Sequence, residues 1–459
     1  MRSTTAQSIG LAIADVLPEA RVLGGGDLRA TSCTSDADAV LPGDIFFAIE
    51  EADCDGHELA GRAIKRGAKA LIVERPLALF GTPQIVVEDT REAYGKFCQR
   101  LVGSPSDQFP VIGIAGSAGK TSTATLLRAI LRTAGMTPGH MAGDELSDGS
   151  LTRSGCKGRV TPPALATWLA RMVAHDCSHG VLEISTDLLR RRVTAGVTLD
   201  VACFTNMDRE HDGNLAATQR TLSAVASSLP ANGAAVLNAD DPGCSKLLST
   251  LDTPTITFAM KRPAELTAKI VSRNASEQVF ILSTGQEFAA VRTTIIGDSH
   301  IYNCLAAAAV AGVYDIDLTT IARGLESVTL LPGVMQRIDS GQEFCMYIDR
   351  AHSSRSLEIC LRAARDVTRG RVITVVRERA ASKKNRDLWA TAEKLSDITV
   401  RAASCEHPDP TTVIAEACYI AAAGDVVLVA GPESEVRGDQ GEAWNDVEVV
   451  RELLRQMPV

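Results

Sequence analysis

The sequence predicts an α/β protein of three domains, with a central P-loop mononucleotide-binding domain built on a parallel sheet and a C-terminal Rossmann-like α/β domain. The chain has 459 residues, more than one hydrophobic core usually holds. A strand, a glycine-rich loop and a helical pattern follow one another from residue 110, and alternating strand and helix patterns fill the chain beyond residue 331. We expect domains at 1–108, 109–331 and 332–459.

The first domain shows short apolar runs at 45–49, 70–73 and 85–87, which predict strands. A helical pattern covers 57–66. The small and polar residues at 103–107 are typical of a linker.

The last domain alternates more regularly, after a boundary marked by Pro332 and Gly333. Near-continuous apolar strands separated by helices favour a parallel sheet covered on both faces. We expect strands at 346–348, 372–376, 398–400 and 426–430, and helices at 354–365, 386–395, 411–423 and 444–456. Between 110 and 331 we also expect alternating α and β elements.

Composition excludes several classes of function. Aromatic residues make up 4%, the net charge is −9 and no basic stripe occurs, so we expect no nucleic-acid partner. No apolar run is long enough for a signal peptide or membrane span, so we expect no membrane insertion. The twelve cysteines are scattered singly, without a Cys-x-x-Cys pair, which favours buried thiols in a reducing cytoplasm over a zinc site or disulfides.

The apolar run 111–115 ends in a glycine-rich loop that leads into a helical pattern. Such loops bring backbone N–H groups and a helix N-terminus to phosphate oxygens, while a lysine reaches the terminal phosphates and a hydroxyl binds Mg²⁺. The strict pattern has glycine where this chain has Ile114, so a glycine-rich turn followed by Lys-Thr is the structural alternative. The predicted ATP-binding residues here are Gly116, Ser117, Ala118, Gly119, Lys120, Thr121 and Ser122.

The shortened form Gly-x-x-Gly-Lys-Thr resembles the loop of the Mur ligases, and nearly the whole chain resembles the MurE type of this family. The resembling segments occur in the family's order: 40–48 with 55–57, Thr161-Pro162-Pro163, Glu183-Ile184-Ser185-Thr186 with Arg192, Phe204-Thr205-Asn206 with Glu210-His211, 238–241, 300–303, Pro332-Gly333 and Asp349-x-Ala351-His352.

The resemblance implies an ATP- and Mg²⁺-dependent ligase that joins an amino acid to a UDP-N-acetylmuramoyl-peptide through an acyl phosphate, a step of peptidoglycan precursor synthesis. It also implies roles for individual residues. Lys120 and the loop amides would hold the phosphates of ATP, Asn303 would contact its base and Asp349 its ribose. Thr121 and Glu183 would bind a first Mg²⁺ and His211 a second, and the catalytic residues would be Lys120, Glu183 and His211. The residues facing the UDP-muramoyl substrate would be Thr161, Ser185 and Arg192.

Each of these residues also has a structural interpretation. Glu183 could be a solvated carboxylate at the end of a strand, and His211 could be a histidine of a surface loop. Arg192 could belong to a run of solvated charges. Asp349 suits a cap on the following helix.

Several positions depart from the family pattern. Val225 stands where the family has the lysine that is carbamylated and carries the second Mg²⁺. The other departures are Asp36-Ala37-Asp38, Val334, Arg350, the segment 377–384, 403–406 in place of the diaminopimelate-recognising Asp-Asn-Pro-Arg, and 431–435. A valine or glutamate in place of arginine cannot form a bidentate contact with a carboxylate, so the amino-acid substrate stays open.

Three hypotheses follow. The first is a peptidoglycan-pathway ligase of unusual specificity. The second is a catalytically impaired paralogue that binds nucleotide or UDP-sugar as a regulator or scaffold. The third is a ligase of this fold acting elsewhere, for example on folate, which the N-terminal UDP-domain-like segment disfavours.

Overall fold

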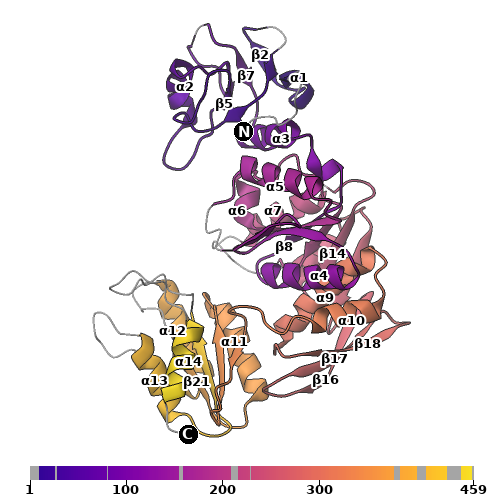
Figure 1. The fold of residues 1–459 in the computed structure, drawn as a ribbon, viewed down its shortest axis with the longest axis vertical. Helices are drawn as coiled ribbons and strands as arrows, with labels where there is room; N and C mark the ends of the chain where they lie inside the picture. The colour runs from indigo at the N-terminus through magenta and orange to yellow at the C-terminus, as the bar shows by residue number, and fades with distance from the viewer. Residues whose placement is uncertain are drawn as a thin grey trace. The chain divides into compact units, whose positions relative to one another are not determined.

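The computed structural model describes residues 10–25, 28–79, 81–154, 159–207, 215–227, 229–376, 383–400, 410–431 and 446–456. The chain divides into two compact units, Met1–Thr257 and Phe258–Val459, and each is described separately. Three larger sheets and the helices that cover them make an α/β protein (Figure 1). The predicted domain limits at 108 and 331 stay a prediction.

The N-terminal sheet has the order β2-β7-β6-β5-β4. All neighbours are parallel except β2 and β7. The strands are β2 (Arg21–Leu23), β4 (Cys33–Thr34), β5 (Ile45–Phe47), β6 (Ala70–Val73) and β7 (Gln84–Val86), and the helices are α1 (Ile13–Val16), α2 (Gly56–Lys65) and α3 (Thr90–Leu101); β1 (Leu11–Ala12) and β3 (Arg29–Ala30) form a separate pair.

Alternate residues of these strands enter two cores, because successive side chains of a strand point to opposite faces. Ile45 and Phe47 share a cluster with Phe97 of α3, whereas Phe46 and Leu71 share another with Ala60 of α2. The expected strands and the expected helix near 57–66 are confirmed.

In the first unit the central sheet has the order β11-β10-β9-β12-β8-β13-β14. The strands are β8 (Val111–Ala115), β9 (Pro138–Ala142), β10 (Glu145–Ser147), β11 (Thr152–Arg153), β12 (His179–Ile184), β13 (Val201–Phe204) and β14 (Ala234–Asn238). The strands from β9 to β14 in this order are parallel, and β10 and β11 add antiparallel edges.

Helices of this unit are η1 (Pro105–Asp107), α4 (Lys120–Thr133), α5 (Pro162–Ala174), α6 (Thr186–Arg190), α7 (Leu215–Ser227) and α8 (Pro242–Leu248). Since β8, β12 and β13 are parallel neighbours, their carboxyl ends meet at one edge of the sheet, where α/β proteins commonly bind ligands. This edge carries the loop after β8 and Glu183.

The strand β15 (Thr255–Ala259) spans the boundary between the units. In the second unit it is followed by the antiparallel strands β16 (Leu266–Arg273), β17 (Gln278–Ser283) and β18 (Phe288–Thr293), then by α9 (Asp298–Val313) and α10 (Leu318–Glu326). The expected α/β alternation up to 331 is wrong here. Buried Phe280 and Leu282 alternate with half-buried neighbours, as in a strand with one solvated face.

The C-terminal sheet has the order β19-β20-β23-β21-β22, parallel except for the edge strand β19. Its strands are β19 (Gln336–Ile338), β20 (Cys345–Asp349), β21 (Val372–Val376), β22 (Ile398–Val400) and β23 (Val426–Ala430), and its helices are α11 (Ser354–Val367), α12 (Lys383–Leu395), α13 (Pro410–Ile420) and α14 (Asp446–Gln456). One core contains residues of α11 and α12, and the other contains residues of α13 and α14. The expected sheet covered on both faces is confirmed (Figure 1).

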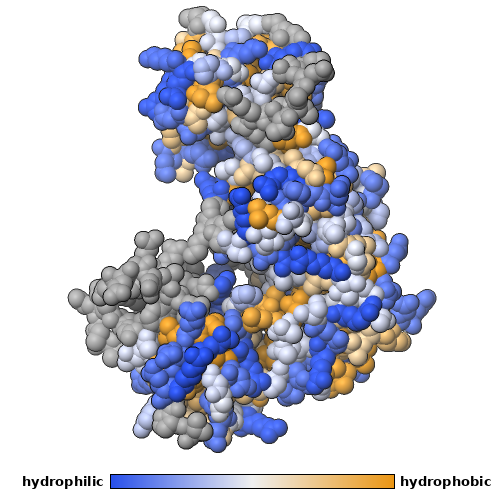
Figure 2. All heavy atoms as spheres, viewed as in Figure 1, coloured by the Kyte–Doolittle hydropathy of each residue, from blue (hydrophilic) through white to orange (hydrophobic). Residues whose placement is uncertain are grey.

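The surface drawn in Figure 2 is mixed in character, and most thiols in the described parts of the chain are buried. On the face drawn in Figure 2, hydrophobic residues lie scattered among hydrophilic ones. No helix in the described parts of the chain is long and apolar enough to cross a membrane. Ten cysteines fall within those parts; all are free and eight are buried.

Candidate functional site

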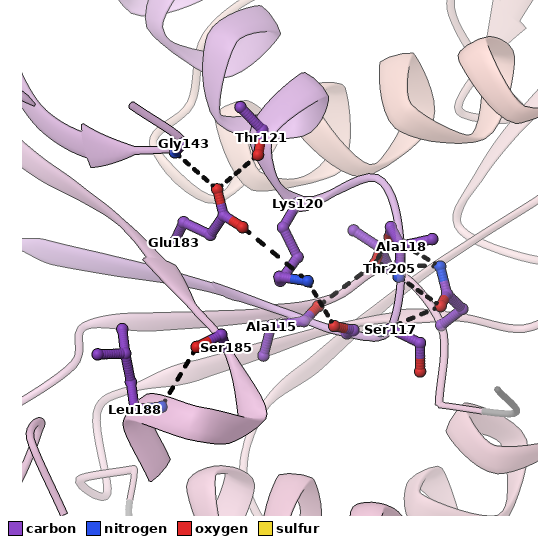
Figure 3. A network of polar contacts seen from close by, with 12 residues as sticks. Ala115, Ser117, Ala118, Lys120, Thr121, Gly143, Glu183, Ser185, Leu188 and Thr205 are labelled. Atoms are coloured by element: carbon purple, nitrogen blue, oxygen red, sulfur yellow. Dashed lines mark hydrogen bonds and ion pairs between the residues drawn. The ribbon is translucent and has the colours of Figure 1, made fainter. Parts of the chain in front are cut away.

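Two strand ends shape the loop of residues 116–121, hereafter the phosphate loop. Gly116 follows β8 with a φ of +138°, and a Cβ atom there would lie 2.2 Å from Thr205 Oγ1, just beyond β13. Thr205 Oγ1 donates a hydrogen bond of 2.6 Å to the carbonyl of Ala118 (Figure 3). The glycine therefore lets two neighbouring strand ends approach closely, in addition to its expected role near phosphate.

Asn206 holds the same loop through both ends of its amide. Its Oδ1 atom accepts hydrogen bonds from the backbone N–H groups of Ser117 and Ala118, at 3.2 and 3.1 Å. Its Nδ2 atom donates to the carbonyl of Ala118 at 2.9 Å. The backbone of the phosphate loop is thus fixed by a side chain 88 residues further along.

Lys120 begins α4 and is nearly buried, with 11% of its side chain exposed. Its Nζ atom donates to the carbonyl of Gly116 at 3.1 Å and lies 3.9 Å from Glu183 Oε1 (Figure 3). Burial lowers the pKa of Lys120, and the charge of Glu183 opposes part of that change. A largely buried cation whose ion-pair partner lies as far as 3.9 Å away is suited to binding an anion.

Glu183 lies in β12, one residue before its carboxyl end. Its Oε2 atom accepts hydrogen bonds from Thr121 Oγ1 at 2.6 Å and from the N–H of Gly143 at 2.9 Å. Figure 3 shows the carboxylate between Thr121, Gly143 and Lys120. The predicted residues Lys120, Thr121 and Glu183 are therefore brought together, along with Gly143, which was not among the predicted site residues.

Three other predicted residues lie at helix starts. Ser122 is buried in the first turn of α4. Thr161 precedes α5 without capping it through its side chain. Ser185 precedes α6, and its hydroxyl accepts the N–H of Leu188 at 3.2 Å (Figure 3). The structure gives Ser185 a capping role, and its predicted substrate contact stays a prediction.

Arg192 has a left-handed backbone, with a φ of +55°. Its guanidinium lies 3.1 Å from the carboxylate of Asp89 and 3.9 Å from that of Glu92, both in or next to the first turn of α3. About half of its side chain is exposed. Arg192 thus connects the N-terminal sheet's helix to the segment after β12, and its predicted substrate contact is untested.

Asn303 and Asp349 belong to the second unit. Asn303 is buried in α9. Asp349 ends β20 and is also buried; its Oδ2 atom accepts the N–H of Met335 at 2.8 Å. Burial raises the pKa of Asp349 to about 6, although the Met335 N–H lowers it in part. His211 lies outside the described residues.

A cavity of about 250 Å³ lies in the second unit. Its lining includes Thr294, Val334, Met335 and Arg337, and none of the predicted site residues. The convergence of Lys120, Thr121 and Glu183 is a better guide to the chemistry than this cavity.

The chain is similar to known proteins in both sequence and fold. The model of the Mur ligase middle domain matches residues 114–311. The UDP-N-acetylmuramoyl-L-alanyl-D-glutamate–2,6-diaminopimelate ligase of Geobacillus kaustophilus is 29% identical over 483 residues, covering 96% of this chain and 98% of that protein. A solved structure of such a diaminopimelate ligase aligns with a TM-score of 0.74 at 18% identity, covering 97% of this chain and 99% of the other.

The chain is similar to Mur ligases over nearly its whole length, and residues 114–311 match their middle domain.

A more distant fold match is the MurF ligase of Thermotoga maritima in complex with ADP, with a TM-score of 0.62, 18% identity, and coverage of 93% and 97%. The middle-domain match includes Lys120, Thr121, Glu183 and Asn303, whereas Asp349 lies beyond it. The part of the chain that matches the Mur ligase middle domain therefore contains the cluster of Lys120, Thr121 and Glu183.

Val225 distinguishes this chain from the pattern of the Mur ligases. It is 5% exposed, in a cluster with Leu222, Ala226, Phe204 and Leu237. The position where the resemblance expects a carbamylated lysine is occupied here by part of an apolar core.

Three contributors to this site were not among the predicted site residues: Thr205, Asn206 and Gly143. Asn206 could have been predicted from the sequence, because it follows β13, a parallel neighbour of the strand that leads into the phosphate loop. Gly143 could not, because it lies in a turn after β9 whose position depends on the pairing of β9 with β12.

Proposed function

We propose that this chain is an ATP-dependent carboxylate–amine ligase that adds an amino acid to a UDP-N-acetylmuramoyl-peptide through an acyl phosphate in peptidoglycan precursor synthesis. The cluster of Lys120, Thr121 and Glu183 at the start of α4 and the end of β12 is the observation that carries the proposal. The similarity to a curated diaminopimelate ligase over 96% of the chain supports the substrate class. The proposal places the reaction in the cytoplasm.

The residues present fit ATP and one Mg²⁺. Mg²⁺ prefers oxygen ligands, and at bond lengths of 2.0–2.1 Å two adjacent ligands of an octahedral ion lie about 2.9 Å apart. Thr121 Oγ1 and Glu183 Oε2 are 2.6 Å apart, so a small opening suffices for both to become ligands. Bound there, Mg²⁺ would neutralise charge on the phosphates.

The chain's own groups act on the same charge. Lys120 Nζ, now bonded to the Gly116 carbonyl, can exchange that bond for a phosphate oxygen. The N-terminus of α4 adds the positive end of a helix dipole behind the loop. Bringing a carboxylate and a triphosphate together requires such positive groups, because both are anions.

Val225 favours a second candidate, a catalytically impaired relative that binds nucleotide or UDP-sugar as a regulator or scaffold. A valine buried at 5% exposure offers no ligand to a second metal ion. The two candidates share the nucleotide site and differ in turnover.

Phosphate release separates them. Purified protein is given Mg-ATP and UDP-N-acetylmuramoyl-dipeptide, with and without a mixture of amino acids. We expect release to rise with the mixture, and to be abolished by Lys120→Ala but not by Lys246→Ala, which removes an exposed lysine on α8. No rise, together with saturable Mg-ATP binding that Lys120→Ala removes, would establish the second candidate instead.

A further inference from the structure

Gly143 lies in the turn between β9 and β10, at a φ of +56°. Its N–H donates to Glu183 Oε2 at 2.9 Å, the same oxygen that accepts the Thr121 hydroxyl. Three segments far apart in the sequence thus meet at one carboxylate oxygen: the start of α4, this turn and the end of β12 (Figure 3).

Gly143 also leaves space for Thr121. A Cβ atom built on Gly143 would lie 2.9 Å from Thr121 Cγ2 and 3.7 Å from Thr121 Oγ1. The first distance is well inside van der Waals contact. A side chain at position 143 would therefore push the threonine, whose hydroxyl is bonded to Glu183.

We propose that Gly143 is a positioning residue of the magnesium–nucleotide site. Its N–H fixes the orientation of the Glu183 carboxylate, and its missing side chain lets Thr121 keep its hydroxyl beside that carboxylate. This inference rests on the proposed function, which assigns Thr121 and Glu183 to Mg²⁺. The residue acts through those two ligands and touches neither metal nor nucleotide.

The chain supplies a matched control. Gly135, in the connection between α4 and β9, also has a positive φ, of +81°, but a Cβ atom there would meet nothing within 4 Å. Alanine at either position carries the similar backbone strain of a left-handed residue. Only at position 143 does the methyl group meet Thr121.

The test measures binding of ATP by titration calorimetry, with Mg²⁺ and with EDTA. In Mg²⁺, we expect Gly143→Ala to weaken binding at least about tenfold, which corresponds to 1.4 kcal/mol. Gly135→Ala should stay within about twofold of the parent protein, a difference below 0.5 kcal/mol by the same conversion. In EDTA the two variants should bind alike, because the defect lies in the metal ligands.

A rescue variant tests the steric step. Serine lacks Cγ2, the atom nearest to the added methyl group, and keeps the hydroxyl. The loss caused by Gly143→Ala should therefore be several-fold smaller in a Thr121→Ser background than in the parent. A loss of equal size in both backgrounds overturns the steric step, and this comparison holds even where Gly143→Ala lowers stability.

The outcomes separate this inference from the function. A parent protein that binds no Mg-ATP overturns both. A parent that binds Mg-ATP while Gly143→Ala and Gly135→Ala behave alike overturns only the role of Gly143. Amino-acid-independent turnover with a selective defect in Gly143→Ala overturns the ligase and leaves the positioning role standing.

Discussion

The guanidinium of Arg192 lies 3.1 Å from the carboxylate of Asp89, although 103 residues separate them. Asp89 also caps α3, accepting the N–H of Glu92 at 3.0 Å. Arg192, which was expected to face the UDP-muramoyl substrate, is therefore ion-paired with a carboxylate of the protein itself. A substrate anion would compete with Asp89 for it.

This competition predicts opposite effects of two substitutions. Asp89→Asn keeps an oxygen to cap α3 but removes the negative charge, so it should leave UDP-N-acetylmuramoyl-dipeptide binding equal or tighter. Arg192→Ala should weaken that binding about tenfold or more, because a charged hydrogen bond is lost. Calorimetric titration measures both. Weaker binding in both variants would mean that the ion pair, rather than the free guanidinium, serves the site.

Asn206 provides a second prediction. Asn206→Asp keeps an acceptor for the N–H groups of Ser117 and Ala118, but it replaces the donor to the Ala118 carbonyl with a second oxygen. It also adds a negative charge beside the phosphate loop. We expect Asn206→Asp to bind Mg-ATP about tenfold more weakly than Asn206→Ala does. Fluorescence titration with a labelled nucleotide measures this, and the reverse order would refute the arrangement.

Asp349 predicts a pH dependence of stability. Burial raises its pKa from the ordinary 3.8 to about 6, so the folded chain binds this proton more tightly than the unfolded chain. The stability that results is fully present below pH 3.8 and is lost as the pH rises through 6. The free energy of unfolding of Asp349→Asn, measured relative to that of the parent, should therefore rise by on the order of 2–3 kcal/mol between pH 3.5 and pH 7.

Urea unfolding at several pH values measures the effect of Asp349→Asn. Asp315→Asn, which changes an exposed carboxylate of the same unit, is the control for the Asp-to-Asn substitution itself. A parallel pH profile for the parent and Asp349→Asn would contradict the prediction.

Val225 gives a fourth prediction. Val225→Lys places an ammonium group among Leu222, Phe204 and Leu237, and should destabilise the protein by about 2–4 kcal/mol. Val225→Met, which also enlarges the side chain but keeps it apolar, should cost less than Val225→Lys, about 1–3 kcal/mol from overpacking. Thermal unfolding compares the two. A stable Val225→Lys variant whose phosphate release rises with bicarbonate would show instead that the position can accept the family's carbamylated lysine.

The sequence predicted the elements better than their contacts. The apolar run 111–115 and the helix that begins at Lys120 appear as expected, because one strand–loop–helix segment defines them locally. The antiparallel strands β16 to β18 were missed, since short apolar runs do not specify a partner. The bond of Gly143 to Glu183 depends on how β9 pairs with β12, which no local pattern records.

The same limit applies to Arg192 and Val225. The run at 190–192 indicated a charged surface, yet the partner of Arg192 comes from α3. The replacement at Val225 was visible in the sequence, whereas its burial among apolar side chains required the fold.

The central place of β8 has a consequence for how the chain acquires its structure. Val111 pairs with Gly180, and Ile112 pairs with both Val181 and Val201. During synthesis, this fully apolar strand has neither of its neighbours until the ribosome has passed β12 and then β13. Long-range pairing of this kind slows folding and exposes an unpaired strand. The phosphate loop is therefore expected to be among the later parts of the first unit to mature, and the newly made chain to benefit from chaperones during that interval.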